Sequence, residues 1–244
     1  MERVSPSERR NDAVSPLFLQ DDGSLFDWEH VFGREARRVL DIGCGNGHYL
    51  LAAARTHPEV DHLGIERVAP LLERAAAEAA TQPLANLRFV LGDAVSMLNH
   101  RFAARSLDEI HVYHPQPYVD PQEVSLGMLT DRCFAHMRDV LKPEGILFLQ
   151  TDSRPYAKYL FEAARLYFRV ERQDGPWPDA PRGRTRREVV AMQKKLTIAR
   201  LRAFPLETPL AIPPPLPYFE RSSVRERRQR KRPGEEASGE RKPK

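Results

Sequence analysis

Residues 38–47, Arg-Val-Leu-Asp-Ile-Gly-Cys-Gly-Asn-Gly, decide the fold. The apolar start with its β-branched residues predicts a short strand, and three glycines at every second position predict a tight turn that lets the backbone approach a ligand. A helix is expected to begin at Gly47, so that its first N–H groups are available to a polar ligand. Because a glycine pattern alone is weak evidence for a binding site, the residues around it decide its meaning.

Strand-like and helix-like stretches alternate from residue 37 to about residue 204. The expected strands are 38–41, 62–66, 87–91, 107–113 and 146–150, and the expected helices are 47–55, 69–80, 121–141 and 155–167. A short helix closed by Gly33 is expected before the first strand. Such alternation implies right-handed crossovers, and it predicts an α/β fold with a Rossmann-like, doubly wound, mostly parallel sheet.

Three acidic residues, Asp41, Glu66 and Asp93, lie at the ends of the first three expected strands. Open α/β sheets bind ligands at the carboxyl ends of their strands. Carboxylates at these positions can meet an ammonium group, the hydroxyls of a ribose and an adenine amino group. An acidic lining would repel a pyrophosphate, and the glycine spacing differs from the G-x-G-x-x-G of dinucleotide sites. The pattern therefore favours S-adenosylmethionine, and ordinary turn acids of a nucleotide-binding fold are the alternative.

The composition limits the class of protein. The chain has 244 residues, of which 41% are hydrophobic, enough for one large domain with tails. No apolar run reaches the roughly 18–20 residues of a membrane span, and residues 1–22 are too polar for a signal peptide. Cys44 and Cys133 are too few for a disulfide framework and lack the spacing of metal ligands. We therefore expect a cytoplasmic protein that binds neither a membrane nor a metal.

The positive charge is concentrated near the C-terminus. Residues 221–244 contain 10 Lys and Arg against 4 Asp and Glu, a net charge of +6, whereas the whole chain carries +4. The six prolines between residues 205 and 217 predict an extended linker. We expect a flexible arm over residues 1–24, one domain over 25–204, and a linker with a disordered basic tail over 205–244. The tail can attract nucleic acid by counterion release, or it is only a solvated end.

Short motifs between residues 27 and 204 stand in an order that one known family shares. They are Asp27-Trp28-Glu29-x-x-Phe32-Gly33, the Asp41 loop in place of E-I-G-x-G-x-G, Gly64-Ile65-Glu66, Asn86-Leu87-Arg88, Asp93-Ala94, Thr151-Asp152 with Tyr156, and Thr185-x-x-Glu188. This set resembles the bacterial tRNA (guanine-N(7)-)-methyltransferase family. The glycine loop alone indicates only the superfamily, whereas the last two motifs are more specific.

The resemblance implies a class I S-adenosylmethionine-dependent methyltransferase with a seven-stranded sheet that acts on tRNA. It implies that the cofactor is bound by Asp41, Gly43, Gly45, Gly47, Glu66, Asp93 and Ala94. It also implies that Asp152, Thr185 and Glu188 hold the target guanine. Thr185 followed by Glu188 is equally a capping box, and both interpretations can hold together.

One motif departs from the family. The family has F-P-D-P-W at the end of the fourth strand, where this chain has His114-Pro115-Gln116-Pro117-Tyr118, so Gln116 takes the place of the acceptor-site Asp. The family's basic run that follows is replaced by residues 119–123, Val-Asp-Pro-Gln-Glu. Guanine N(7) has a free lone pair and needs no general base, and the tail could supply the lost phosphate contacts. The alternatives are methyl transfer to another RNA or a small molecule, and a non-catalytic RNA-binding or scaffold protein.

Overall fold

The computed structural model describes residues 18–19, 23–117 and 127–215. The strands are β1 (Phe18–Leu19), β2 (Arg37–Ile42), β3 (Val60–Glu66), β4 (Leu87–Leu91), β5 (Leu107–Tyr113), β6 (Leu141–Thr151), β7 (Phe168–Arg172) and β8 (Ala199–Pro205). The helices are α1 (Trp28–Phe32), α2 (His48–Thr56), α3 (Ala69–Ala80), α4 (Ala94–His100), α5 (Asp131–Val140), α6 (Arg154–Ala164) and α7 (Arg186–Gln193).

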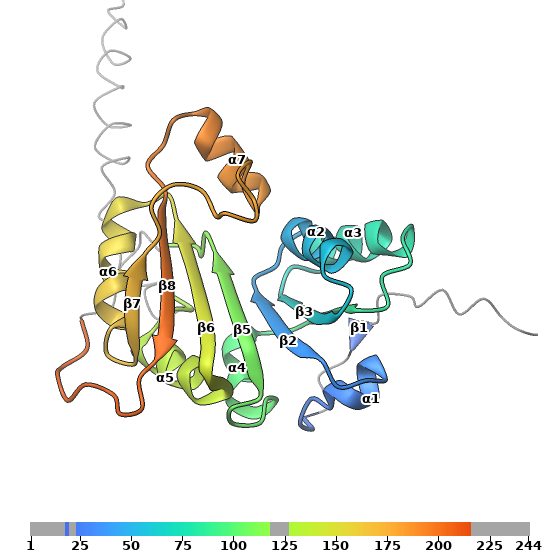
Figure 1. The fold of residues 1–244 in the computed structure, drawn as a ribbon, viewed down its shortest axis with the longest axis horizontal. Helices are drawn as coiled ribbons and strands as arrows, with labels where there is room; N and C mark the ends of the chain where they lie inside the picture. The colour runs from blue at the N-terminus through green and yellow to red at the C-terminus, as the bar shows by residue number, and fades with distance from the viewer. Residues whose placement is uncertain (1–17, 20–22, 118–126, 216–244) are drawn as a thin grey trace, which may run out of the picture.

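Within these ranges the strands form one sheet in the order β1-β4-β3-β2-β5-β6-β8-β7 (Figure 1). The pairs from β4 to β6 are parallel, and β8 runs antiparallel to both β6 and β7. The expected seven-stranded, mostly parallel α/β fold is confirmed, and β1 adds a two-residue parallel strand beside β4. The chain leaves β2 toward β3 and β4 and later returns to β5 on the other side. The topological switch point therefore lies between β2 and β5.

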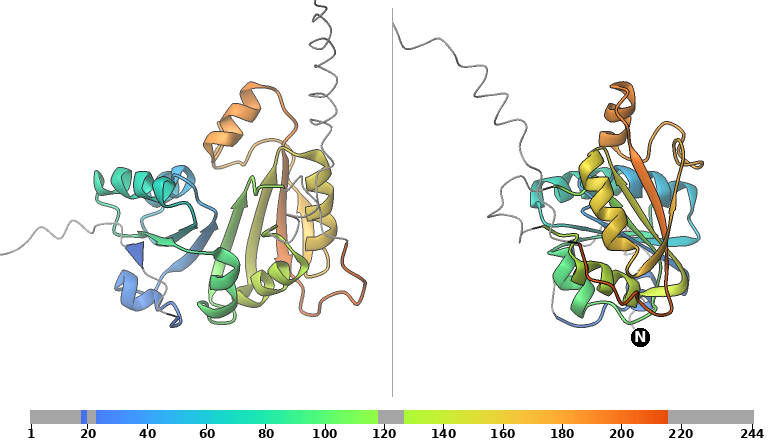
Figure 2. Two further views of the ribbon diagram at one scale, coloured as in Figure 1. Left: turned by 180° about the vertical axis from the view of Figure 1, so that it is seen from behind. Right: turned by 90° about the vertical axis from the view of Figure 1, so that its left-hand side faces the viewer.

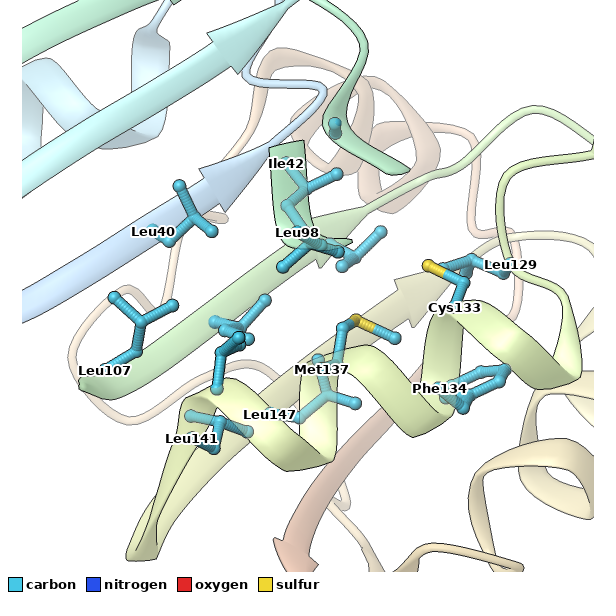
Figure 3. Packing of buried hydrophobic residues seen from close by; sticks show 14 of the residues in the cluster. Leu40, Ile42, Leu98, Leu107, Leu129, Cys133, Phe134, Met137, Leu141 and Leu147 are labelled. Carbon is cyan, nitrogen blue, oxygen red and sulfur yellow. The ribbon is translucent and has the colours of Figure 1, made fainter. Parts of the chain in front are cut away.

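Helices cover both faces of the sheet (Figures 1 and 2). Alternate strand residues such as Leu40 and Ile42 face α4, α5 and α6, where Cys133, Phe134 and Met137 complete the larger apolar core (Figure 3). On the opposite face α2 and α3 form a smaller core around the Phe89 ring. Because both faces of the central strands are covered, their backbones are fixed, and the loops at their carboxyl ends are held in place.

The helix expected over residues 121–141 was wrong in its start. Residues 118–126 lie outside the described ranges, and α5 begins only at Asp131. Thr130 is the N-cap, and its hydroxyl accepts a hydrogen bond from the Cys133 N–H at 3.3 Å. A capping hydroxyl satisfies an N–H that would otherwise lack a partner, which Pro121 cannot do. The described residues on either side of this gap, 114–116 and 127–130, border the candidate site.

The expected domain limits differ slightly from the observed elements. Phe18–Leu19, placed in the expected arm, is part of the sheet, and β8 extends to Pro205. The start of the proline-rich segment folds back onto the domain, since the N–H groups of Leu206 and Leu210 donate to the carbonyls of Tyr167 and Leu166 at 2.8 and 2.7 Å. The basic tail lies outside the described residues, so its disorder and role stay predictions. In the described part of the chain, no helix is long and apolar enough to cross a membrane.

Candidate functional site

A cleft of about 510 Å³ opens at the carboxyl ends of β2, β3, β4 and β5. It lies at the topological switch point, where open α/β sheets bind their ligands. Its lining includes Gly43, Glu66, Asp93, Ala94 and Gln116, which the sequence singled out, together with His114 and Thr130. Among the described residues, no group of three or more His, Cys, Asp or Glu is placed to hold a metal ion.

The Glu66 carboxylate fixes the shape of the glycine loop. One oxygen accepts the Gly45 N–H at 3.0 Å, and the other accepts the N–H groups of Arg67 and Val68 at 2.9 and 3.0 Å. An ionised carboxylate offers about four acceptor positions. Glu66 therefore retains about one position for a hydroxyl donor, on the oxygen that faces Gly45.

Gly47 is required by close packing as well as by backbone conformation. Its φ is +70°, and a Cβ there would lie 3.0 Å from both the Ala75 Cβ and the Phe89 ring. Gly43 and Gly45 also have positive φ, but nothing lies within 4 Å of a Cβ built at either residue. The first two glycines therefore leave open space along the loop, whereas Gly47 seats α2 against the sheet.

Asp41 is a buried carboxylate without a donor. It is 3% exposed, and no described residue donates a hydrogen bond to its side chain. Burial, and to a lesser extent the neighbouring Glu66, raise the pKa of Asp41 to about 8, although Arg184 acts in the opposite direction. A buried charge is unfavourable unless it is paired. The site at the end of β2 is thus suited to a cationic group, which would restore the charged form of Asp41.

Asp93 lies at the far side of the cleft and caps α4. Its Oδ1 accepts the Ser96 N–H at 2.8 Å, as an N-cap side chain should. Asp93 and Ala94 both line the cleft. The second oxygen of Asp93 makes no hydrogen bond with a described residue, so it can accept one from a ligand.

A directed chain of hydrogen bonds connects the loop after β7 to Asp152. The Trp177 indole donates to the side-chain oxygen Oε1 of Gln150 at 2.6 Å, and the side-chain nitrogen Nε2 of Gln150 lies 2.9 Å from His114 Nε2. His114 Nδ1 lies 3.2 Å from Asp152 Oδ1. Since an amide N–H only donates and a carboxylate only accepts, the imidazole carries its proton on Nδ1. His114 has φ +51° and is one of three described non-glycine residues with a positive φ.

Asp152 is held from a second side by Arg187 of α7. The Arg187 Nη2 lies 3.0 Å from Asp152 Oδ1, and its Nε lies 3.2 Å from the same oxygen. Burial acts to raise the pKa of Asp152, but the hydrogen bonds from Arg187 and His114 outweigh it and lower the pKa below its ordinary value. The carboxylate is therefore ionised at neutral pH and ready to accept hydrogen bonds.

Thr185 and Glu188 lie at the start of α7, where the sequence predicted a capping box. The Thr185 hydroxyl accepts the Glu188 N–H at 3.1 Å, which confirms its role as N-cap. Glu188 is fully buried, and its Oε2 accepts the Arg184 N–H at 2.7 Å. Its Oε1 pairs with the buried Arg200 of β8 at 2.6 Å. Glu188 therefore ties α7 to the sheet, and its carboxylate is not exposed to the cleft.

Gln116 lies at the edge of the cleft and is exposed. Its side-chain amide donates a hydrogen bond to the backbone carbonyl of the neighbouring Pro117 at 3.2 Å. The side chain is thus free to meet a ligand, and it carries no charge.

Arg184 closes the loop between β7 and α7 onto the sheet, a role that sequence reasoning did not identify. Its guanidinium lies 4.7–6.0 Å from the ring centroids of Tyr49, Tyr113, Phe148 and Trp177, and it pairs with Asp179 at 2.6 Å. Cation–π contacts of this kind are strongest when the cation is desolvated, and the Arg184 side chain is only 9% exposed. Arg184 thereby anchors the start of α7.

Other partners of the site were also missed. His114 was visible as a histidine where the family motif has Phe, but its partners Gln150 and Asp152 lie 36 and 38 positions away along the chain. The ion pairs of Arg187 and Arg200 join residues 35 and 12 positions apart, and no sequence spacing predicts them.

Solved structures show the same fold. A 16S rRNA methyltransferase, KamB, superposes with a TM-score of 0.54 at 14% identity over 75% of this chain and 95% of that one. The aminoglycoside resistance methyltransferase NpmB1 does so with a TM-score of 0.50 at 21% identity over 73% of this chain and 91% of that one. At these identities the likeness concerns the fold alone.

The sequence comparisons are more specific. Residues 35–201 match the family described as "Putative methyltransferase". A tRNA (guanine-N(7)-)-methyltransferase of Pseudomonas putida is 33% identical over 186 residues, which cover 75% of this chain and 78% of that protein. A protein of the same name from Alkalilimnicola ehrlichii is 32% identical over 161 residues, 66% of this chain and 68% of that protein. The chain therefore belongs to the tRNA (guanine-N(7)-)-methyltransferase family.

Proposed function

We propose that this chain transfers a methyl group from S-adenosylmethionine to N(7) of a guanine in tRNA. The observation that carries the proposal is the identity with tRNA (guanine-N(7)-)-methyltransferases over three quarters of the chain. The family match over residues 35–201 includes the glycine loop as well as α7. Because the proposed substrate is tRNA, the cytoplasm is the proposed compartment.

The carboxyl ends of β2, β3 and β4, here called the cofactor half, fit S-adenosylmethionine. Asp41 is buried and lacks a donor, so it would accept hydrogen bonds from the ammonium group. Glu66 would use its remaining acceptor position for a ribose hydroxyl, and Asp93 would accept from the adenine amine. The open space beside Gly43 and Gly45 would admit the ligand to the loop.

When bound, S-adenosylmethionine supplies a methyl group activated by a sulfonium. The residues of the chain then have to position the acceptor, since oriented binding alone supplies up to roughly 7–11 kcal/mol of a displacement barrier. Guanine N(7) carries a lone pair, so no side chain has to remove a proton before attack.

The carboxyl ends of β5 and β6 together with α7, here called the acceptor half, would hold the guanine. Asp152 is ionised, and it would accept hydrogen bonds from the ring N–H and the exocyclic amine. Arg187 occupies the same carboxylate, but its side chain is 53% exposed and can move aside. Thr185 and Glu188 would act mainly through α7, by capping it and by anchoring it to Arg200.

Gln116 is proposed to orient groups at the reacting edge of the purine. A carboxylate there would stabilise the positive charge that develops on the base, and an amide does so only weakly. Loss of one well-placed electrostatic contact typically slows a reaction by about 10²–10³-fold. The proposed enzyme is therefore slower at the chemical step than a relative with Asp at this position.

The test is incubation of the full chain with labelled cofactor and unmodified tRNA, followed by cleavage at methylated guanine. We expect label in tRNA and cleavage at a guanine. A non-catalytic RNA-binding protein would bind the cofactor or tRNA in calorimetry without transferring label, and methyl transfer to another acceptor would leave tRNA unlabelled. Either result would overturn the proposal.

A further inference from the structure

The segment around α7 carries a concentration of unpaired positive charge. Residues 181–198 contain six Lys and Arg against a single acidic residue, Glu188, which is buried. Arg182, Arg186, Lys194 and Lys195 are exposed and are here called the α7 surface. None of these four side chains makes a hydrogen bond or ion pair with a described residue, so their charges are available to a partner.

Several cations elsewhere on the domain are paired with a carboxylate. Arg34 bonds to Asp61, Arg37 to Glu109, Lys142 to Asp108, Arg165 to Glu162 and Arg202 to Glu171. The α7 surface instead gathers four cations without a described partner into one short segment, which Arg184 and Glu188 anchor to the sheet.

The position of the α7 surface relates it to the acceptor half. α7 projects beyond the sheet at the end where β5 and β6 finish (Figures 1 and 2). Arg187, between the exposed cations, pairs with Asp152 at 3.0 Å. A helix rises 1.5 Å per residue, so Arg186 and Lys194 lie about 12 Å apart along the axis. That separation exceeds the spacing of neighbouring phosphates on one strand, and the two ends would contact different phosphates.

We propose that the α7 surface binds backbone phosphates of the RNA strand that flanks the target guanine. This inference rests on the proposed function, and it assigns the phosphate contacts to a structured helix. The chain needs such a surface because residues 119–123 carry acidic and neutral side chains in place of a basic run. Neutralised phosphates release counterions, so this binding depends strongly on salt.

The test uses the full chain with Arg186→Gln and Lys194→Gln, and tRNA binding is measured by anisotropy at several salt concentrations. A matched control, Arg74→Gln with Arg105→Gln, removes two exposed charges from α3 and from the turn before β5. We expect the α7 variant to bind tRNA about tenfold more weakly, with a salt slope lower by about 2. The control is expected to bind tRNA as the unchanged chain does, and both variants should retain cofactor affinity.

The outcomes separate this inference from the proposed function. If the unchanged chain binds tRNA but transfers no methyl group, the proposed function fails, and the binding data still decide the α7 surface. Unchanged affinity and slope in the α7 variant would overturn the inference, as would an equal loss in the control. A loss confined to a chain lacking residues 221–244 would assign the phosphate contacts to the tail and overturn it as well.

Discussion

The two halves of the candidate site hold their carboxylates by different means. In the cofactor half, Glu66 and Asp93 accept hydrogen bonds from backbone N–H groups no farther than 21 residues away. In the acceptor half, the side chains of Arg187 and Arg200 hold Asp152 and Glu188, although Glu188 also accepts the backbone N–H of Arg184. Backbone donors are supplied by any sequence that folds correctly, whereas side-chain donors depend on particular residues.

This difference predicts that the two halves diverge unequally. A carboxylate that organises a loop through backbone donors cannot change without loss of the loop, so the glycine loop is expected to keep its motif. A site built from long-range side-chain pairs can exchange single members while the frame stays. The family resemblance implies that Gln116 is such an exchange, and among the described residues its side chain bonds to the neighbouring Pro117.

The largest expected effect concerns the buried pair of the acceptor half. Glu188→Gln leaves the Arg200 guanidinium buried without its anion, and breaking a buried pair costs about 3–5 kcal/mol. We expect a corresponding fall in the free energy of unfolding, measured in urea. The double change Glu188→Gln with Arg200→Met removes the unpaired charge and should recover most of that loss.

The same double variant separates support from contact. If Glu188 acts by anchoring α7, methyl transfer returns together with stability. A folded double variant that remains inactive would instead show that Glu188 contacts the guanine. In that case Glu188 would bind a ligand directly, as the carboxylates of the cofactor half are proposed to do.

The next effect tests whether the acceptor half is otherwise complete. Gln116→Asp places a carboxylate beside the purine that becomes positively charged, and kcat is expected to rise by about 10–100-fold. Gln116→Asn is the matched control because it has the size of Asp without its charge. Cofactor affinity should be unchanged in both variants. Equal rates for Asp and Asn would show that charge at this position does not limit the reaction.

Much of the fold followed from local sequence. The bounds of α3, β4 and β5 were predicted as they are observed, because propensity and apolar periodicity agree in these segments. The start of α5 and the places of β7 and β8 did not follow, because a capping threonine and antiparallel pairing with a distant strand decide them.

The site divides in the same way. Asp41, Glu66 and Asp93 could be placed because each ends or follows a strand, and parallel strands bring these ends together. The partners of Asp152 and Glu188 could not be placed, because they depend on how α7 packs over the sheet.

A smaller effect concerns Asp41 in the cofactor half. Asp41→Asn removes the charge that would meet the ammonium group, and cofactor affinity is expected to fall about 30-fold, close to 2 kcal/mol for a charged hydrogen bond. Calorimetry measures this affinity for S-adenosylmethionine. Unchanged affinity would contradict the assigned role, and Asp41 would then be only a buried acid.

The difference in stability between the Asp41→Asn variant and the unchanged chain is expected to depend on pH. Folding raises the pKa of Asp41 from 3.8 to about 8, so between these values the folded chain retains a proton that the unfolded chain has lost. Stability from this group is complete below pH 3.8 and falls as the pH rises to about 8. Asn mimics the neutral form, so the variant without cofactor should gain in Tm over the unchanged chain at pH 8 and hardly at all near pH 4. An equal Tm difference at both pH values would contradict the raised pKa.

The smallest effect separates helix capping from substrate contact at Thr185. Thr185→Ala removes the hydroxyl that accepts the Glu188 N–H, which should cost about 1 kcal/mol of stability and raise KM for tRNA. Thr185→Ser keeps a capping hydroxyl and should behave as the unchanged chain in both measurements, because Ser and Thr cap helices similarly. If Ser restored stability but left KM high, the threonine would act through its methyl group against the substrate. The acceptor half would then recognise its ligand partly by shape, whereas the carboxylates of the cofactor half are proposed to act by hydrogen bonds.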